Sequence, residues 1–115
     1  MRTITLGLLG LGTVGSGVVK LLQAQQAKLA QTAQVHFHLK RVAVAHIAKH
    51  QNDPLPTDTV LTDNISDVLN DPDIQVVIET MGTVDLARDV IKQAIYRGKS
   101  IITANKDLLA TDGPQ

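Results

Sequence analysis

The sequence contains no cysteine and no tryptophan, and only one tyrosine and one phenylalanine among its 115 residues. The absence of cysteine excludes a disulfide scaffold, a thiolate nucleophile and a cysteine-based zinc cluster. Because aromatic residues make up only 2% of a chain that is 43% hydrophobic, the core must be built from Val, Ile, Leu and Ala. Such a core is typical of a parallel sheet covered by helices, whose central strands are apolar, β-branched runs.

An excess of charge of either sign is also missing, because Lys and Arg together number 11 and so do Asp and Glu. A neutral chain without basic clusters gives no electrostatic reason to expect nucleic acid or an anionic membrane as a partner. No apolar run reaches the length of a membrane span, and the N-terminus lacks the order of a signal peptide. We therefore expect one soluble, cytoplasmic domain over residues 1–115.

Hydrophobic periodicity predicts strands and helices in alternation. The expected strands are 3–9, 35–45, 60–62, 74–79 and 100–103, and the expected helices are 14–34, 65–69, 84–97 and a short one within 104–113, with a loop at 46–58. Asn64 and Asp67 resemble a capping pair for the second helix, and Gly98 is expected to end the third. The apolar face of the third helix is expected to be Ala87, Val90, Ile91, Ala94 and Ile95. The order of elements predicts an α/β fold with a doubly wound, Rossmann-type parallel sheet of strand order 3-2-1-4-5.

A glycine motif separates the first expected strand from the first expected helix. Gly10, Gly12 and Gly15 spell G-x-G-x-x-G. The first glycine permits a tight turn, the second lets backbone approach a pyrophosphate, and the third lets helix and strand pack closely. A glycine-rich turn without a ligand is the alternative, and a Walker-type loop is excluded because Gly-Lys-Ser/Thr is missing. Gly7 and Gly17 lie outside the motif, and we assign both to packing.

The end of the second strand bears on the choice of dinucleotide. An NAD site usually has an acidic residue there, but no carboxylate occurs before Asp53, and the positions in question are Ala45, His46 and Lys49. With no carboxylate to repel a 2′-phosphate and with cationic groups nearby, NADP is slightly favoured over NAD. A solvated basic loop is the alternative interpretation.

Three segments carry a resemblance to a known family: GLLGLGTVGSGVVKLL, VVIETMGT and SIITANKDLLATDG. Together they resemble the nucleotide-binding domain of homoserine dehydrogenase over nearly all of the chain. The resemblance implies reversible, NAD(P)-dependent interconversion of L-homoserine and L-aspartate 4-semialdehyde, a step toward threonine, methionine and isoleucine.

The resemblance also implies roles for individual residues. Lys106 would reach the reacting centre as the catalytic residue, and Thr80 would lie beside the nicotinamide half of the cofactor. Leu11, Thr13 and Val14 would contact the diphosphate. The full set of implied cofactor-binding residues is Gly10, Leu11, Gly12, Thr13, Val14, Gly15, Ala45, His46, Lys49, Thr80, Met81, Gly82, Asn105 and Lys106.

The chain also departs from the family pattern. Thr83 replaces the second glycine of a G-G pair and could cap the following helix, and Ala45-His46 stands where many members carry Arg-Asp. Family members continue into a substrate and dimerisation domain, so this chain resembles a truncated cofactor-binding half of a homo-oligomeric enzyme. We expect it to bind dinucleotide and to turn over no substrate by itself.

Alternative functions remain open. The chain could be a non-catalytic NAD(P)-sensing domain, or the cofactor domain of another semialdehyde or amino-acid dehydrogenase such as aspartate dehydrogenase. Exposed apolar surface distinguishes the first alternative from the cofactor-binding half of an enzyme. Such a half should expose the apolar face on which the second domain docks, whereas a sensor should not. Glu79 could position a ligand or cap the next helix. No metal site is expected, because the pairs His36/His38 and His46/His50 lack further ligands.

Overall fold

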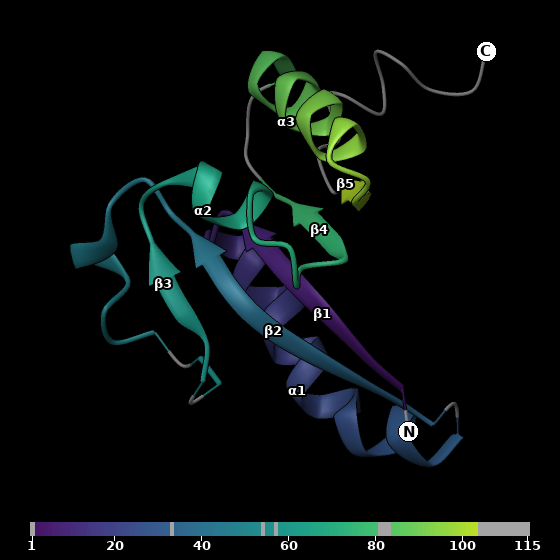
Figure 1. The fold of residues 1–115 in the computed structure, drawn as a ribbon. Coiled ribbons are helices and arrows are strands. Elements are labelled where there is room, and N and C mark those ends of the chain that lie inside the picture. The colour runs from purple at the N-terminus through teal and green to yellow at the C-terminus, as the bar shows by residue number, and fades with distance from the viewer. Residues whose placement is uncertain (1, 33, 54, 57, 81–83, 104–115) are drawn as a thin grey trace.

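The computed structural model describes residues 2–32, 34–53, 55–56, 58–80 and 84–103. The elements are β1 (Arg2–Leu9), α1 (Thr13–Thr32), β2 (Val35–Ala43), the 3₁₀ turn η1 (Ile47–Lys49), β3 (Val60–Thr62), α2 (Ile65–Leu69), β4 (Val76–Glu79), α3 (Val84–Tyr96) and β5 (Ser100–Thr103). All strand pairs are parallel, and the sheet has the order β3-β2-β1-β4-β5 (Figure 1). The predicted fold class and strand order are therefore confirmed. Within the described ranges, no helix is long and apolar enough to cross a membrane.

Two aliphatic layers cover the faces of the sheet. Successive side chains of β1 point to opposite faces, so Leu6 and Leu8 pack with Val19 of α1, whereas Leu9 packs with Val68 of α2 and with α3. α1 therefore lies on one face, and α2 and α3 lie on the other (Figure 1). Full burial of one such aliphatic side chain contributes roughly 1.5–3 kcal/mol, so these layers hold the sheet mainly with aliphatic residues, and the partly buried Phe37 packs against the layer beside α1.

A bulge interrupts the pairing of β1 with β2. Leu6 pairs with Leu39, but Gly7 pairs with Arg41, which leaves Lys40 as an extra residue on β2. The extra residue interrupts the alternation of side chains, and the consecutive residues Lys40 and Arg41 both reach the carboxylate of Asp71. The bulge thereby lets β2 bind the turn that precedes β4.

Glycines outside the motif differ in what surrounds them. A Cβ at Gly7 would lie 2.5 Å from Cγ1 of Val68, so α2 packs directly on β1 at this point and the packing assignment is confirmed. A Cβ at Gly17 would have no described atom within 4 Å, so the packing assignment for Gly17 is wrong. Gly98 has φ +75° and ends α3, because Lys99 N donates to Ala94 O.

Several expected boundaries and contacts differ from the structure. β2 ends at Ala43 and not at residue 45, β4 begins at Val76 and not at residue 74, and the expected loop contains η1. Asn64 caps α2 by accepting from Ser66 N, but Asp67 accepts from Thr62 Oγ1 and forms no reciprocal cap. The expected short helix within residues 104–113 lies outside the described residues.

The expected apolar face of α3 is only partly correct. Val90 and Ala94 are buried, whereas 63% of Ile95 is exposed. α3 also ends at Tyr96, one residue before the expected end. Periodicity alone marks Ile95 as apolar but does not show that its side chain is exposed in the fold.

Candidate dinucleotide-binding site

The glycine loop lies where β1 ends, between the ends of β2 and β4. Gly10 has φ +97°, a left-handed conformation that glycine adopts without strain. Its N–H donates to Ala43 O of β2 at 2.8 Å, and Thr80 N donates to Leu9 O at 2.9 Å. The loop is thus fixed at the carboxyl edge of the sheet, where doubly wound sheets bind their ligands.

Gly12 and Gly15 have opposite surroundings. A Cβ at Gly15 would overlap the carbonyl oxygen of Gly10 and lie 2.9 Å from its carbonyl carbon and 3.0 Å from Thr80 Oγ1. A Cβ at Gly12 would meet nothing within 4 Å, and Gly12 is exposed. The third glycine therefore allows α1 to pack on the loop, and the second leaves open backbone that fits the approach of a pyrophosphate.

Two hydroxyl groups hold the carbonyl oxygens of this loop. Thr80 Oγ1 lies 2.9 Å from Leu9 O and 3.2 Å from Gly10 O, and Ser16 Oγ donates to Leu11 O at 3.1 Å. Within the described part of the chain, no acceptor is found for the N–H groups of Leu11 and Gly12. These amides, with the first N–H groups of α1, can therefore bind an anion. Sequence reasoning missed Ser16, since nothing in its local pattern marks that contact.

The remaining predicted residues of the motif begin α1 or precede it. Thr13 and Val14 are exposed in the first turn, with Val14 50% exposed, whereas Leu11 is buried at 5% exposure. Leu11 can thus contribute backbone, but its side chain belongs to the core beside α1. Thr13 and Val14 are therefore accessible beside the loop.

The residues after β2 form a separate, exposed group. Ala45, His46 and Lys49 are all exposed. The first carboxylate of this segment, Asp53, lies 2.7 Å from Nδ1 of His50. The segment therefore presents a lysine, and its nearest carboxylate is occupied by a histidine of the same turn.

Glu79 is fully buried at the carboxyl end of β4. Thr103 Oγ1 donates to Glu79 Oε2 at 2.7 Å, which joins the end of β5 to the end of β4. A cap on the helix after β4 would involve residues 81–83, which are not described. Met81, Gly82, Asn105 and Lys106 likewise lie outside the described residues.

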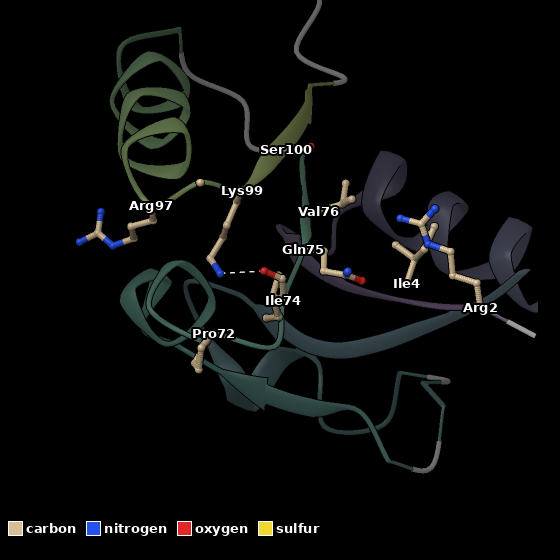
Figure 2. A pocket seen from close by; sticks show the side chains of 10 residues that line it. Arg2, Ile4, Pro72, Ile74, Gln75, Val76, Arg97, Lys99 and Ser100 are labelled. Carbon is tan, nitrogen blue, oxygen red and sulfur yellow. Dashed lines mark hydrogen bonds between the residues drawn. The ribbon is translucent and has the colours of Figure 1, made fainter.

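A cavity of about 530 Å³ lies at the opposite edge of the sheet, at the amino ends of β1, β4 and β5 (Figure 2). Its cations do not converge: Arg97 points outward on one side of Lys99, and Arg2 lies on the other side (Figure 2). Lys99 donates to the carbonyl oxygens of Asp71 and Ile74, and burial lowers its pKa. Lys99 thereby stabilises the turn before β4.

Asp71 is the centre of the charged contacts at that edge. Its side chain, 4% exposed, accepts from Lys40 Nζ at 2.8 Å and from Arg41 Nε at 2.7 Å. Burial raises the pKa of this carboxyl group, but the hydrogen bonds from Lys40, Arg41 and Asp73 N outweigh burial and hold the pKa well below its ordinary value. The cluster joins β2 to the turn before β4.

The histidine pairs do not assemble a metal site within the described ranges, where no group of three His, Asp or Glu side chains could hold an ion. His36 is exposed, and Nε2 of His38 lies 2.9 Å from Oδ2 of Asp58.

Comparison with known proteins shows which family this chain is similar to. Residues 10–115 match the family described as "Homoserine dehydrogenase, NAD binding domain". The chain is 44% identical over 115 residues to the homoserine dehydrogenase of Bacillus subtilis, and 42% identical over 113 residues to that of Synechocystis. These two matches include 100% and 98% of this chain but only 26% and 25% of the length of the two relatives. The chain thus spans about a quarter of their length.

Solved structures agree with the sequence comparison. The homoserine dehydrogenase of Thiobacillus denitrificans superimposes with a TM-score of 0.85 at 39% identity, over 98% of this chain and 26% of that one.

Proposed function

The chain belongs to the homoserine dehydrogenase family, and from this premise we propose that it is the NAD(P)-binding domain of an enzyme that interconverts L-homoserine and L-aspartate 4-semialdehyde. The observation that carries the proposal is the glycine loop, in which Gly15 packs against Gly10 while Gly12 stays open at the carboxyl edge of the sheet. The loop donors suit the pyrophosphate of a dinucleotide. The parent enzyme would be a cytoplasmic homo-oligomer that serves threonine, methionine and isoleucine synthesis.

This assignment gives the cofactor and the protein separate roles in the reaction. When bound, the nicotinamide supplies or accepts the hydride that converts aldehyde to alcohol or alcohol to aldehyde. We propose that Lys106 hydrogen-bonds the reacting oxygen and helps to move its proton, which is the ordinary work of a general acid or base at such a centre. Met81, Gly82 and Asn105 are proposed to contact the cofactor from the segments that follow β4 and β5.

NADP is proposed as the preferred cofactor. Lys49 is exposed after β2, and the carboxylate of Asp53 is engaged by His50, so a 2′-phosphate meets a cation and no free carboxylate in this segment. Calorimetric titration of the purified chain with NADPH and with NADH tests both the site and the preference. The lack of tryptophan removes a common fluorescence signal and favours calorimetry.

We expect saturable binding, with a higher affinity for NADPH than for NADH. Lys49→Ala should lower the affinity for NADPH but not that for NADH, so that the two affinities become more similar. Failure of the folded chain to bind either dinucleotide would overturn the proposal. Equal affinities in the unchanged chain would overturn only the NADP preference.

The catalytic step is proposed to need a second domain, which would supply the substrate site. Exposed apolar side chains support this view over a self-contained sensor: Ile95 is 63% exposed and Tyr96 89% exposed on α3, and Ile102 is 57% exposed on neighbouring β5. A sensor domain that functions alone is not expected to expose these apolar side chains to solvent. Homoserine oxidation by the rigorously purified 115-residue chain would contradict this part of the proposal.

A further inference from the structure

Thr80 makes two contacts that affect the orientation of the peptide groups in the glycine loop. Its hydroxyl lies 2.9 Å from Leu9 O and 3.2 Å from Gly10 O, and both carbonyl groups belong to the segment where β1 passes into the loop. Thr80 belongs to a different segment, 70 residues away from Gly10 in the chain. The contact therefore fixes the loop relative to β4.

The planarity of the peptide bond gives this contact a direction. In a trans peptide, the C=O of one residue and the N–H of the next point in opposite directions. When Gly10 O points toward Thr80, the N–H of Leu11 must point away from Thr80. The same argument applies one residue later, where Ser16 Oγ holds Leu11 O at 3.1 Å and so turns the N–H of Gly12 outward.

The two amides turned outward in this way are those that lack an acceptor within the described part of the chain. An unpaired N–H that the fold holds in place can bind an oxyanion without a further loss of conformational freedom. A loop whose carbonyl oxygens were free could rotate its peptides and present an oxygen to the ligand. Such a carbonyl oxygen would repel a phosphate.

We propose that Thr80, assisted by Ser16, is a positioning residue: its hydroxyl holds the carbonyl of Gly10 inward so that the N–H of Leu11 faces the pyrophosphate. Thr80 thus acts on the cofactor through the loop backbone. This inference rests on the proposed function, because the ligand is the dinucleotide assigned above.

The test uses isosteric removal of the hydroxyl. Thr80→Val should weaken dinucleotide binding by about five- to tenfold, the effect of losing a hydroxyl group that is shared between the carbonyl oxygens of Leu9 and Gly10, and Thr80→Ser should restore it. Thr59→Val is the matched control, because Thr59 Oγ1 also donates to a carbonyl, Leu39 O, at 2.6 Å in a part of β2 away from the loop. The control should lose stability without losing affinity for the cofactor.

Further readouts keep the outcomes distinct. Ser16→Ala should also weaken binding several-fold and serves if Thr80→Val does not fold. In the free chain, heteronuclear NOE values at Leu11 and Gly12 should fall in Thr80→Val and stay unchanged in Thr59→Val.

Unchanged affinity and unchanged NOE values in both loop variants would overturn the positioning role. A wild-type chain that binds no dinucleotide would overturn the proposed function, and the NOE values would still decide whether Thr80 orders the loop.

Discussion

Replacing single glycines by alanine tests whether the loop is built for a ligand or only for a turn. Gly15→Ala would set a methyl group against the carbonyl group of Gly10 and 3.0 Å from Thr80 Oγ1. Because the obstructing atoms are mainly backbone, the helix or the loop must shift. Overpacking of this kind costs about 1–3 kcal/mol of unfolding free energy, and the shift should abolish measurable dinucleotide binding.

Gly12→Ala should separate binding from stability. No described atom lies within 4 Å of the added Cβ, and among the described glycines only Gly10 and Gly98 have positive φ. The free energy of unfolding should therefore change by less than about 1 kcal/mol, the cost of a poorer residue before the first turn of a helix. Affinity should fall by about tenfold or more, since the methyl group stands where the pyrophosphate approaches the backbone.

Gly17→Ala is the matched control for both variants. Gly17 lies in exposed α1 with open space around its Cβ, so alanine should raise the unfolding free energy by about 0.5–1 kcal/mol through helix propensity. Its affinity for the cofactor should equal that of the unchanged chain. Urea unfolding followed by far-UV circular dichroism gives the stabilities, and calorimetry gives the affinities. Wild-type affinity in Gly12→Ala, or equal stability of Gly15→Ala and Gly17→Ala, would refute the reasoning.

Two further predictions concern the opposite edge of the sheet and its interior. Asp71→Asn should lower the unfolding free energy by about 1–3 kcal/mol at pH 7, because the bonds from Lys40 and Arg41 lose their charged acceptor. The depressed pKa of Asp71 means that this contribution is present above the ordinary value of 3.8 and is lost as the pH falls below it, so the two unfolding curves should converge in acid. Gly7→Ala should cost about 1–3 kcal/mol because its Cβ would lie 2.5 Å from Val68 Cγ1. The double variant with Val68→Ala should be more stable than the sum of the two single effects predicts, and strict additivity in urea unfolding would contradict the contact.

The sheet and the glycine loop were predictable from sequence because both depend on local signals. Apolar runs marked the strands, and the right-handed crossover rule then left one order for the sheet. The loop followed from glycine spacing, since only glycine serves at Gly10 with its φ of +97°. The boundaries were less predictable, because Val44 is still buried although β2 has ended at Ala43.

Contacts between distant segments were not predictable in the same way. Asn64 caps α2 as its local sequence suggests, but Asp67 turns to Thr62 because the end of β3 places a hydroxyl beside it. Thr103 and Glu79 meet only because β4 and β5 are neighbours in the sheet. A resemblance marked Thr80 as a cofactor residue, whereas its contacts with the loop carbonyls required three-dimensional structure.

The two edges of the sheet solve different physical problems. At the amino edge, Asp71 is nearly buried and must be neutralised, so the fold surrounds it with Lys40 and Arg41 and fixes the adjacent turn. At the carboxyl edge, the segment from Gly10 to Val19 contains no charged residue, and its carbonyl oxygens are held by hydroxyl groups. Neutral donors leave the negative charge of a phosphate to be stabilised by oriented amides, with no counter-ion to displace. The glycine loop, which has no charged residue of its own, is therefore suited to bind a pyrophosphate through its backbone amides.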